Sequence, residues 1–257
     1  MTVTRQTFIL SNASAELRRH RDRYNSRHRC HCGDRTRIVS ATDPYWTQTD
    51  EVQRMFAGHT GQTWAAGMAR MDFREPGLVA ASLEWALQGR ILDAPILDAG
   101  CGTGLCAPLV KGFSRRLEGV DLSANMLEAA RQGGQYDALH VAEIVSFLEA
   151  HRGYGAIVAS GVCVFLNDLR PLFAAVRHAL IDHGLFVFTI DLHDGEEEVV
   201  VSPRQRAMTL HNPQHMLREA CRGGLELLRF ERCRMRNDFY KLQPIEGAVV
   251  VLKQRRR

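Results

Sequence analysis

The sequence has no apolar run long enough to cross a bilayer, which takes about 18 to 20 consecutive apolar residues. Its longest apolar stretch, Tyr154 to Leu166, contains Ser160 and two glycines and is typical of a buried strand. The N-terminus also lacks the extended apolar segment of a secretory signal. We therefore expect a cytoplasmic protein that does not associate with a membrane.

A paired cysteine pattern is lacking too, because the seven cysteines are odd in number and most lie in apolar stretches. This argues against a disulfide framework and favours a reduced, intracellular protein. A Cys-His-Cys run at residues 30–32, with His20 and His28 nearby, lacks the spacing of about two to four residues that structural zinc sites place between paired cysteines. No second Cys/His pair follows at a suitable distance, so we expect no metal site.

Acidic residues are scarce at the N-terminal end of the chain. Residues 1–40 hold nine arginines against three acids, whereas the rest of the 257-residue chain has a slight excess of acids. A basic tail of this kind can contact RNA or an acidic partner. We favour the alternative of a solvated, partly disordered extension over residues 1–40.

A helical pattern follows this extension, and we predict a helical cover over residues 41–90. Asp50 is a suitable cap for a helix at 51–57, and Pro76 is suited to the start of a helix at 77–87. The intervening HTGQTWAAGMARMDF has no clear periodicity. Because two helices with an adaptable connector often serve as a lid, we expect this segment to cover a pocket.

Residues 91–257 alternate short apolar runs with helical patterns, which predicts an α/β domain. Continuous apolar runs between helices are typical of parallel strands that are covered on both faces. The last two runs are joined by a polar segment too short for a helical crossover, so they predict a hairpin. The expected fold is a doubly wound sheet of seven strands, mostly parallel with one antiparallel strand. The predicted strands are 96–99, 117–121, 139–142, 156–160, 185–191, 225–230 and 248–252, and the helical patterns lie near 105–112, 123–132, 143–151, 168–181 and 213–222.

Three glycines, Gly100, Gly102 and Gly104, directly follow the first predicted strand. Glycine allows a sharp turn and lets the backbone approach a ligand closely. The dinucleotide pattern G-x-G-x-x-G would need glycine at the position of Leu105. Asp98, just before the turn, favours a cationic or amine-bearing ligand over a phosphate. The turn is therefore expected to hold a ligand other than a dinucleotide.

Further acids follow the second and third strands. Asp121 can accept both ribose hydroxyls of an adenosine, or it can cap the helix that follows. Ser123 is itself a good N-cap, which would leave Asp121 to the ligand. Glu143 can accept from an adenine amino group while Ile144 packs on the ring, although an acid at this position is more often a first-turn helix residue.

LDAGCGTG, VDLSANMLEAAR, the acid of AEIVSFL and the stretch from YGAIVASGVCVFLNDLRPLFAAVRHAL to GLFVFTID together resemble class I S-adenosylmethionine-dependent methyltransferases. The resemblance spans about residues 50–252 and is closest to the small-molecule branch with an N-terminal helical cover. It implies a Rossmann-like fold and S-adenosyl-L-methionine as cofactor. The implied cofactor contacts are Gly100, Cys101, Gly102 and Gly104 in the turn at the methionine moiety, Asp98 at its amino group, Asp121 at the ribose, Leu122 and Met126 beside the adenine, Glu143 and Ile144 at its edge, and Ser160 beside the sulfonium.

The sequence contains no convincing catalytic triad, carboxylate pair or metal set. A sulfonium methyl is already activated, so the protein chiefly has to align an acceptor and exclude water. The segment after the fourth strand reads Ala159-Ser160-Gly161-Val162 and lacks the Asn/Asp-Pro-Pro-Tyr of enzymes that methylate base or glutamine amino groups. No cluster of basic and aromatic residues accompanies the predicted site, so we expect no nucleic acid partner.

Candidate pocket residues lie in segments expected over the carboxyl edge of the sheet. His59 and Trp64 belong to the cover, Phe165 follows the fourth strand, and His211 follows the fifth. His211 or His59 can act as a general base, and Trp64 can stack on a planar substrate. The alternatives are solvated histidines and a tryptophan in the core.

The favoured function is methyl transfer to an O, N or C atom of a small metabolite. One alternative is a cyclase or lyase that converts the same cofactor into azetidine-2-carboxylate and methylthioadenosine. Another is a non-catalytic cofactor-binding partner subunit. The acceptor and the oligomeric state stay undefined, and residues 192–212 are assigned only as an excursion next to the active site.

Overall fold

The computed structural model describes residues 56, 61–202, 208–238 and 240–256. His59, the basic segment 1–40 with its Cys-His-Cys run, and all but Phe56 of the helix predicted at 51–57 lie outside the described residues. The predictions made for them, and the division of the chain into extension, cover and α/β domain, stay predictions. No helix in the described part of the chain is long and apolar enough to cross a membrane.

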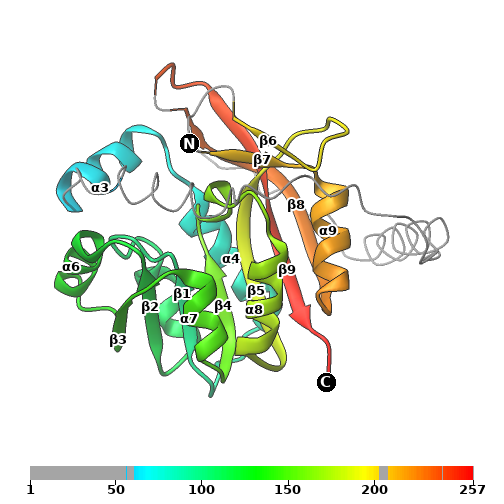
Figure 1. The fold of residues 1–257 in the computed structure, drawn as a ribbon. Helices are drawn as coiled ribbons and strands as arrows, with labels where there is room; N and C mark the ends of the chain where they lie inside the picture. The colour runs from blue at the N-terminus through cyan, green and yellow to red at the C-terminus, as the bar shows by residue number, and fades with distance from the viewer. Residues whose placement is uncertain (1–55, 57–60, 203–207, 239, 257) are drawn as a thin grey trace, which may run out of the picture. The chain divides into compact units, whose positions relative to one another are not determined.

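A seven-stranded sheet organises the α/β domain (Figure 1), with the strand order β3-β2-β1-β4-β5-β9-β8. Strands β1 to β5 pair in parallel, whereas β9 runs antiparallel to both of its neighbours. This confirms the prediction of a mostly parallel, Rossmann-like sheet with one antiparallel strand. The strands are β1 Ile96–Ala99, β2 Leu117–Asp121, β3 Ala138–Val141, β4 Tyr154–Ala159, β5 Leu180–Asp191, β8 Leu225–Asn237 and β9 Pro244–Gln254.

Helices cover both faces of this sheet, which explains why its central strands are continuous apolar runs. In β4, Ile157 packs into a core with α7, α8 and α9, whereas its neighbour Val158 packs into a second core with α4 and α5. Successive side chains of a strand point to opposite faces. Because both faces of the sheet are covered, every β4 position is buried. The helices are α3 Gly61–Arg70, α4 Glu75–Leu87, α5 Ala107–Val110, α6 Ala124–Gln132, α7 Ile144–Ala150, α8 Arg170–Ala179 and α9 Pro213–Arg222, with 3-10 turns η1 Lys111–Phe113 and η2 Cys163–Phe165.

Two segments differ from the expected pattern. The connector in the cover contains helix α3, although its sequence has no clear periodicity. The segment 192–212 contains a second, two-stranded sheet of β6 Val199–Val201 and β7 Thr209–His211. Thr209 Oγ1 donates to the carbonyl oxygens of Val164 and Leu166 at 3.1 and 3.2 Å, which fixes β7 beside the η2 turn.

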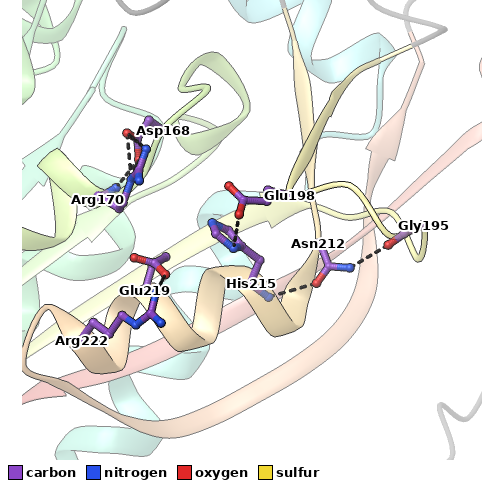
Figure 2. A network of polar contacts seen from close by, with 8 residues as sticks. All are labelled: Asp168, Arg170, Gly195, Glu198, Asn212, His215, Glu219 and Arg222. Atoms are coloured by element: carbon purple, nitrogen blue, oxygen red, sulfur yellow. Dashed lines mark hydrogen bonds and ion pairs between the residues drawn. The ribbon is translucent and has the colours of Figure 1, made fainter. Parts of the chain in front are cut away.

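The same excursion is tied to α9, as Figure 2 shows. Asn212 caps this helix, because its Oδ1 accepts from the His215 amide at 3.0 Å while its Nδ2 donates to the Gly195 carbonyl at 2.8 Å. His215 Nδ1 lies 3.2 Å from Glu198 Oε1. These contacts link both ends of the β6–β7 excursion to a helix that packs on the sheet.

Candidate active site

A cavity opens at the carboxyl ends of the parallel strands, where strand order reverses between β1 and β4. One part of its wall, which we call the turn half, comes from segments that end β1, β2 and β3. The other part, the cover half, comes from the cover, the η2 turn, Met208 and β8. The turn half is Asp98, Gly100, Cys101, Gly102, Thr103, Leu105, Cys106, Asp121, Leu122, Met126, Glu143 and Ile144, and the cover half is Phe56, Trp64, Met68, Met71, Phe73, Glu75, Pro76, Val164, Phe165, Leu166, Met208 and Arg236.

The end of β4 contacts both halves. Gly100 has a φ of +75°, and a Cβ on it would lie 2.5 Å from Val162 Cγ2. A Cβ on Gly161 would lie 2.9 Å from Phe73 Cζ and 3.3 Å from Glu75 Oε2. Ser160, which precedes Gly161, also lines the cavity, and its Oγ has no hydrogen-bond partner among the described residues. The predicted position of Ser160 at the rim of the fourth strand is therefore correct.

Gly104 does not line the cavity, unlike the other residues proposed for the cofactor. Its φ of +88° favours glycine, and a Cβ there would lie 3.1 Å from Tyr136 Cε2. Gly104 thus provides the sharp turn and the close packing of Tyr136, and the expectation that it contacts the ligand is corrected.

The amide groups of the turn donate to acceptors within the protein. Gly100 N and Cys101 N donate to the Val120 carbonyl at 2.8 and 3.0 Å. Gly102 N donates to Asp121 Oδ2 at 2.8 Å. A phosphate-binding turn directs its amide groups at the ligand. These three amides are already bonded and are therefore not directed at a pyrophosphate, in agreement with the sequence pattern.

Asp98 lies under the turn with a side chain that is almost completely buried. Tyr136 donates its hydroxyl proton to Asp98 Oδ2 at 2.7 Å. Burial raises the pKa of Asp98 to about 7, the bond from Tyr136 opposes this rise, and the nearby Asp121 adds to it. A positively charged group arriving in the cavity would stabilise the ionised carboxylate.

Asp121 and Glu143 line the cavity and also stabilise the protein's own backbone. Asp121 accepts from Ser123 N at 2.8 Å, in addition to Gly102 N, while Ser123 Oγ caps α6. Burial raises the pKa of Asp121, and these amides oppose the rise. Glu143 caps α7 by accepting from Val145 N and Ser146 N at 2.9 and 2.8 Å. Glu143 is thus the N-cap of α7 rather than the first-turn acid of the alternative interpretation, and it also lies in the cavity wall.

The charge of the lining is unbalanced. Its described carboxylates are Asp98, Asp121 and Glu143 in the turn half and Glu75 in the cover half, and Arg236 is the one cationic side chain among its described residues. Unlike charges attract more strongly where water is excluded. The cavity therefore favours a ligand that carries positive charge.

Aromatic side chains gather in the cover half. The Phe56 ring lies edge-on to Trp64 at 4.9 Å and to Phe165 at 5.8 Å between ring centroids. Met68, Met71 and Met208 line the same half, and methionine adapts to irregular apolar surfaces. Trp64 and Phe165 therefore lie where the sequence placed them, against a site suited to a planar apolar group.

His211 does not lie in the cavity wall. Its side chain is buried, and Nε2 lies 3.3 Å from Thr209 Oγ1. Burial lowers its pKa to about 4, which leaves the imidazole neutral at pH 7. A buried histidine away from the lining is a poor general base for an acceptor, so our proposal does not use it.

The sequence interpretation missed three polar residues of this region: Tyr136, Glu75 and Arg236. They come from the loop before β3, from the start of α4 and from β8, which lie far apart in the chain. Glu75 begins a largely apolar helix, whereas Arg236 lies in a strand with several other charged residues, so no local pattern distinguishes it. Within the described residues, no group of three or more His, Cys, Asp or Glu is arranged to hold a metal ion.

The strand order, the glycine turn after β1 and the acids after β2 and β3 are those of a class I methyltransferase fold. Residues 96–184 match the family model described as a methyltransferase domain. Residues 96–184 are therefore similar to a methyltransferase domain.

Two curated proteins are similar to parts of the chain. Methyltransferase-like protein 27 of Homo sapiens is 43% identical over 74 residues, which cover 28% of this chain and 30% of that protein. Ubiquinone biosynthesis O-methyltransferase of Serratia proteamaculans is 28% identical over 113 residues, which cover 41% of this chain and 46% of that protein. The chain thus matches less than half the length of each relative.

Solved structures share the fold over most of the chain. The 1,6-didemethyltoxoflavin-N1-methyltransferase of Burkholderia thailandensis, bound to 1,6-didemethyltoxoflavin and S-adenosylhomocysteine, has a TM-score of 0.63 at 17% identity and covers 85% of this chain and 94% of its own. Magnesium protoporphyrin IX methyltransferase of Synechocystis PCC 6803 has a TM-score of 0.61 at 13% identity and covers 80% and 99%. At these identities the likeness concerns the fold.

Proposed function

We propose that the protein binds S-adenosyl-L-methionine and transfers its methyl group to an O, N or C atom of a small metabolite. The observation that supports this most is the turn half itself, where carboxylates line the cavity and the turn amides are bonded internally. Such a wall suits a ligand with an ammonium group and a sulfonium and opposes a pyrophosphate. The shared fold of S-adenosylhomocysteine-bound methyltransferases supports the same cofactor.

The residues that would hold the cofactor follow from their places in the turn half. Asp98 is the carboxylate for the amino group of the methionine moiety, and Asp121 is the acceptor for the ribose hydroxyls. Leu122, Met126 and Ile144 supply apolar surface for the adenine, and Glu143 lies at its edge. The proposed contacts run along the cofactor in the order β1, β2 and β3, because these strands end in that order beneath the turn half.

When bound, the cofactor supplies a methyl group that is already activated on a sulfonium. The chain then has to orient an acceptor and exclude water. Phe56, Trp64 and Phe165 present ring surfaces for an apolar acceptor, and Ser160 offers a hydroxyl at the end of β4. Relatives that methylate a nitrogen and others that methylate an oxygen share this fold, so the fold leaves the methylated atom open.

Incubation with S-adenosylmethionine tests this proposal directly. The purified protein is supplied with the cofactor and a panel of small planar acceptors, and products are identified by mass spectrometry. We expect S-adenosylhomocysteine to form only when an acceptor is present. Methylthioadenosine formed from the cofactor alone would instead support the cyclase or lyase alternative. Absence of both products, with the cofactor bound, would support a partner subunit without catalysis.

A further inference from the structure

A buried cluster of charged residues forms part of the cover half. Arg236 Nη1 donates to Glu75 Oε1 at 2.6 Å and to Asp191 Oδ1 at 3.0 Å, and its Nη2 donates to Asp191 Oδ2 at 2.5 Å. The three side chains are 1–3% exposed and come from α4, β5 and β8. One guanidinium is thus shared between two carboxylates in a region from which water is largely excluded.

The cluster has a carboxylate in excess. Both terminal nitrogens of Arg236 are engaged by carboxylate oxygens, so its charge is already more than balanced. Burial raises the pKa of Asp191 to about 6, while Arg236 opposes the rise and Glu75 adds to it. Isolated buried charge is costly unless a counter-charge or hydrogen-bond donor reaches it. The excess negative charge of this cluster therefore acts on a ligand bound in the cavity.

Glu75 connects this cluster to the end of β4. Its Oε2 accepts from Thr189 Oγ1 at 2.5 Å, and Thr189 Oγ1 accepts in turn from Gly161 N at 2.8 Å. Glu75 Oε2 would lie 3.3 Å from a Cβ on Gly161, which shows how closely the carboxylate approaches this strand end. Ser160 Oγ, beside Gly161, has no partner among the described residues and lines the same cavity. A polar group of a ligand at this point would face both side chains.

We infer that Glu75, held in place by Arg236 and Asp191, selects an acceptor that is neutral or cationic and presents an N–H or O–H donor at the methylated atom. This inference rests on the proposed function and narrows its acceptor class. A carboxylate or phosphate on the acceptor would meet the excess negative charge of the cluster, and Arg236 is already engaged. The ring surfaces of the cover half bind the apolar body of the acceptor, and Glu75 orients its donor group.

Glu75 also accepts the proton that the acceptor loses during the methyl transfer. The proton of the acceptor would pass to the Glu75 carboxylate, a lone pair of the acceptor nitrogen or oxygen would form the bond to the methyl carbon, and the electron pair of the broken sulfur–carbon bond would stay on sulfur. A carboxylate oxygen that accepts one hydrogen bond retains a second lone pair for this proton. Glu75 is then a catalytic residue, whereas Arg236 and Asp191 are positioning residues.

Three matched probes test the selection: 1-naphthylmethylamine, 1-naphthylmethanol and 1-naphthoate, which share one ring system and differ in charge. Their affinities are measured by calorimetry on protein saturated with S-adenosylhomocysteine. We expect the amine or the alcohol to bind at least about tenfold more tightly than the carboxylate. In Glu75→Gln this ratio should fall to below about threefold, because the negative charge facing the probe is removed.

Glu84→Gln is the matched control, since Glu84 is an exposed acid on the same helix and lies outside the cavity lining. It should keep the wild-type ratio. If Glu75→Gln does not fold, Asp191→Asn reduces the charge of the same cluster and should lower the ratio in the same direction. A carboxylate that binds as tightly as the amine and alcohol, a ratio unchanged in the folded variant, or a wild-type protein that binds none of the three probes would overturn the inference. Failure of the wild-type protein to bind S-adenosylhomocysteine would instead overturn the proposed function.

Discussion

Tyr136 donates a hydrogen bond of 2.7 Å to Asp98. The glycine turn above this pair begins at Gly100, two residues after Asp98. The pair places a buried carboxyl group below the cavity and stabilises its ionised form against the cost of burial. The charge state of Asp98 near neutral pH therefore depends on both the tyrosine and the ligand.

Cofactor affinity should depend on pH through Asp98. Its pKa in the ligand-free protein is raised to about 7, and an ammonium-bearing ligand binds the ionised carboxylate better than the neutral acid. Affinity for S-adenosylhomocysteine should therefore rise by roughly tenfold between about pH 6 and pH 8 and then level off. Calorimetric titrations across this range measure it. Asp98→Asn should bind weakly and show little of this pH dependence, whereas an equally steep dependence in that variant would contradict the assignment.

Tyr136→Phe should move the same pH profile upward. The tyrosine bond lowers the pKa of Asp98, so its removal leaves the carboxyl harder to ionise. We expect the midpoint of the affinity profile to shift to higher pH and the free energy of unfolding to fall by about 1–2 kcal/mol at pH 8. Chemical denaturation and the titrations above measure both quantities. An unshifted midpoint would show that the hydroxyl does not stabilise the ionised acid.

Gly100→Ala should disrupt the turn. The added Cβ would lie 2.5 Å from Val162 Cγ2 on a backbone with φ of +75°. We expect a loss of about 1–3 kcal/mol in the free energy of unfolding, together with weaker cofactor binding. Gly77→Ala is the control, because nothing lies within 4 Å of its added Cβ and Gly77 is in helix α4. That change should be neutral or slightly stabilising. Equal effects of the two substitutions on binding would argue against a special role for Gly100.

His211 should affect stability in acid rather than the pH dependence of catalysis. Burial lowers its pKa to about 4, so between about pH 6.5 and pH 4 the unfolded chain takes up a proton that the folded protein does not. This contribution to the free energy of unfolding is present above about pH 6.5 and is lost as the pH falls toward 4. His211→Gln should weaken that loss in denaturation curves. If His211→Gln instead abolished methyl transfer with the fold and cofactor affinity intact, His211 would regain the role of general base.

Much of the fold was predictable because local signals agree with the global arrangement. The continuous apolar runs at β1, β2 and β4 predict buried parallel strands, and the short polar link after β8 predicts the antiparallel pairing of β9. The unassigned excursion could not be predicted as the β6–β7 pair, because its strands are only three residues long each. Their placement depends on tertiary bonds such as those of Thr209, which leave no local pattern.

The candidate site was predictable in its turn half, whereas Trp64 and Phe165 were the only residues predicted in the cover half. Asp98, Asp121 and Glu143 each lie at or just beyond the carboxyl end of a strand, so their meeting at one sheet edge could be inferred. The Glu75–Arg236 contact joins residues 161 positions apart, and nothing in the spacing of either residue indicates the other. Polar contacts that only tertiary folding creates were therefore missed in the cover half of the cavity.

In the proposed function, the turn half holds S-adenosylmethionine chiefly through Asp121. Calorimetric titration of S-adenosylhomocysteine into wild-type protein, Asp121→Ala and the control Asp182→Ala tests it, since Asp182 is an exposed acid outside the cavity lining. Removal of the half-buried carboxylate that accepts from the ribose hydroxyls should weaken binding by about tenfold or more, while the control keeps wild-type affinity. Unchanged affinity in a folded Asp121→Ala protein would contradict the account.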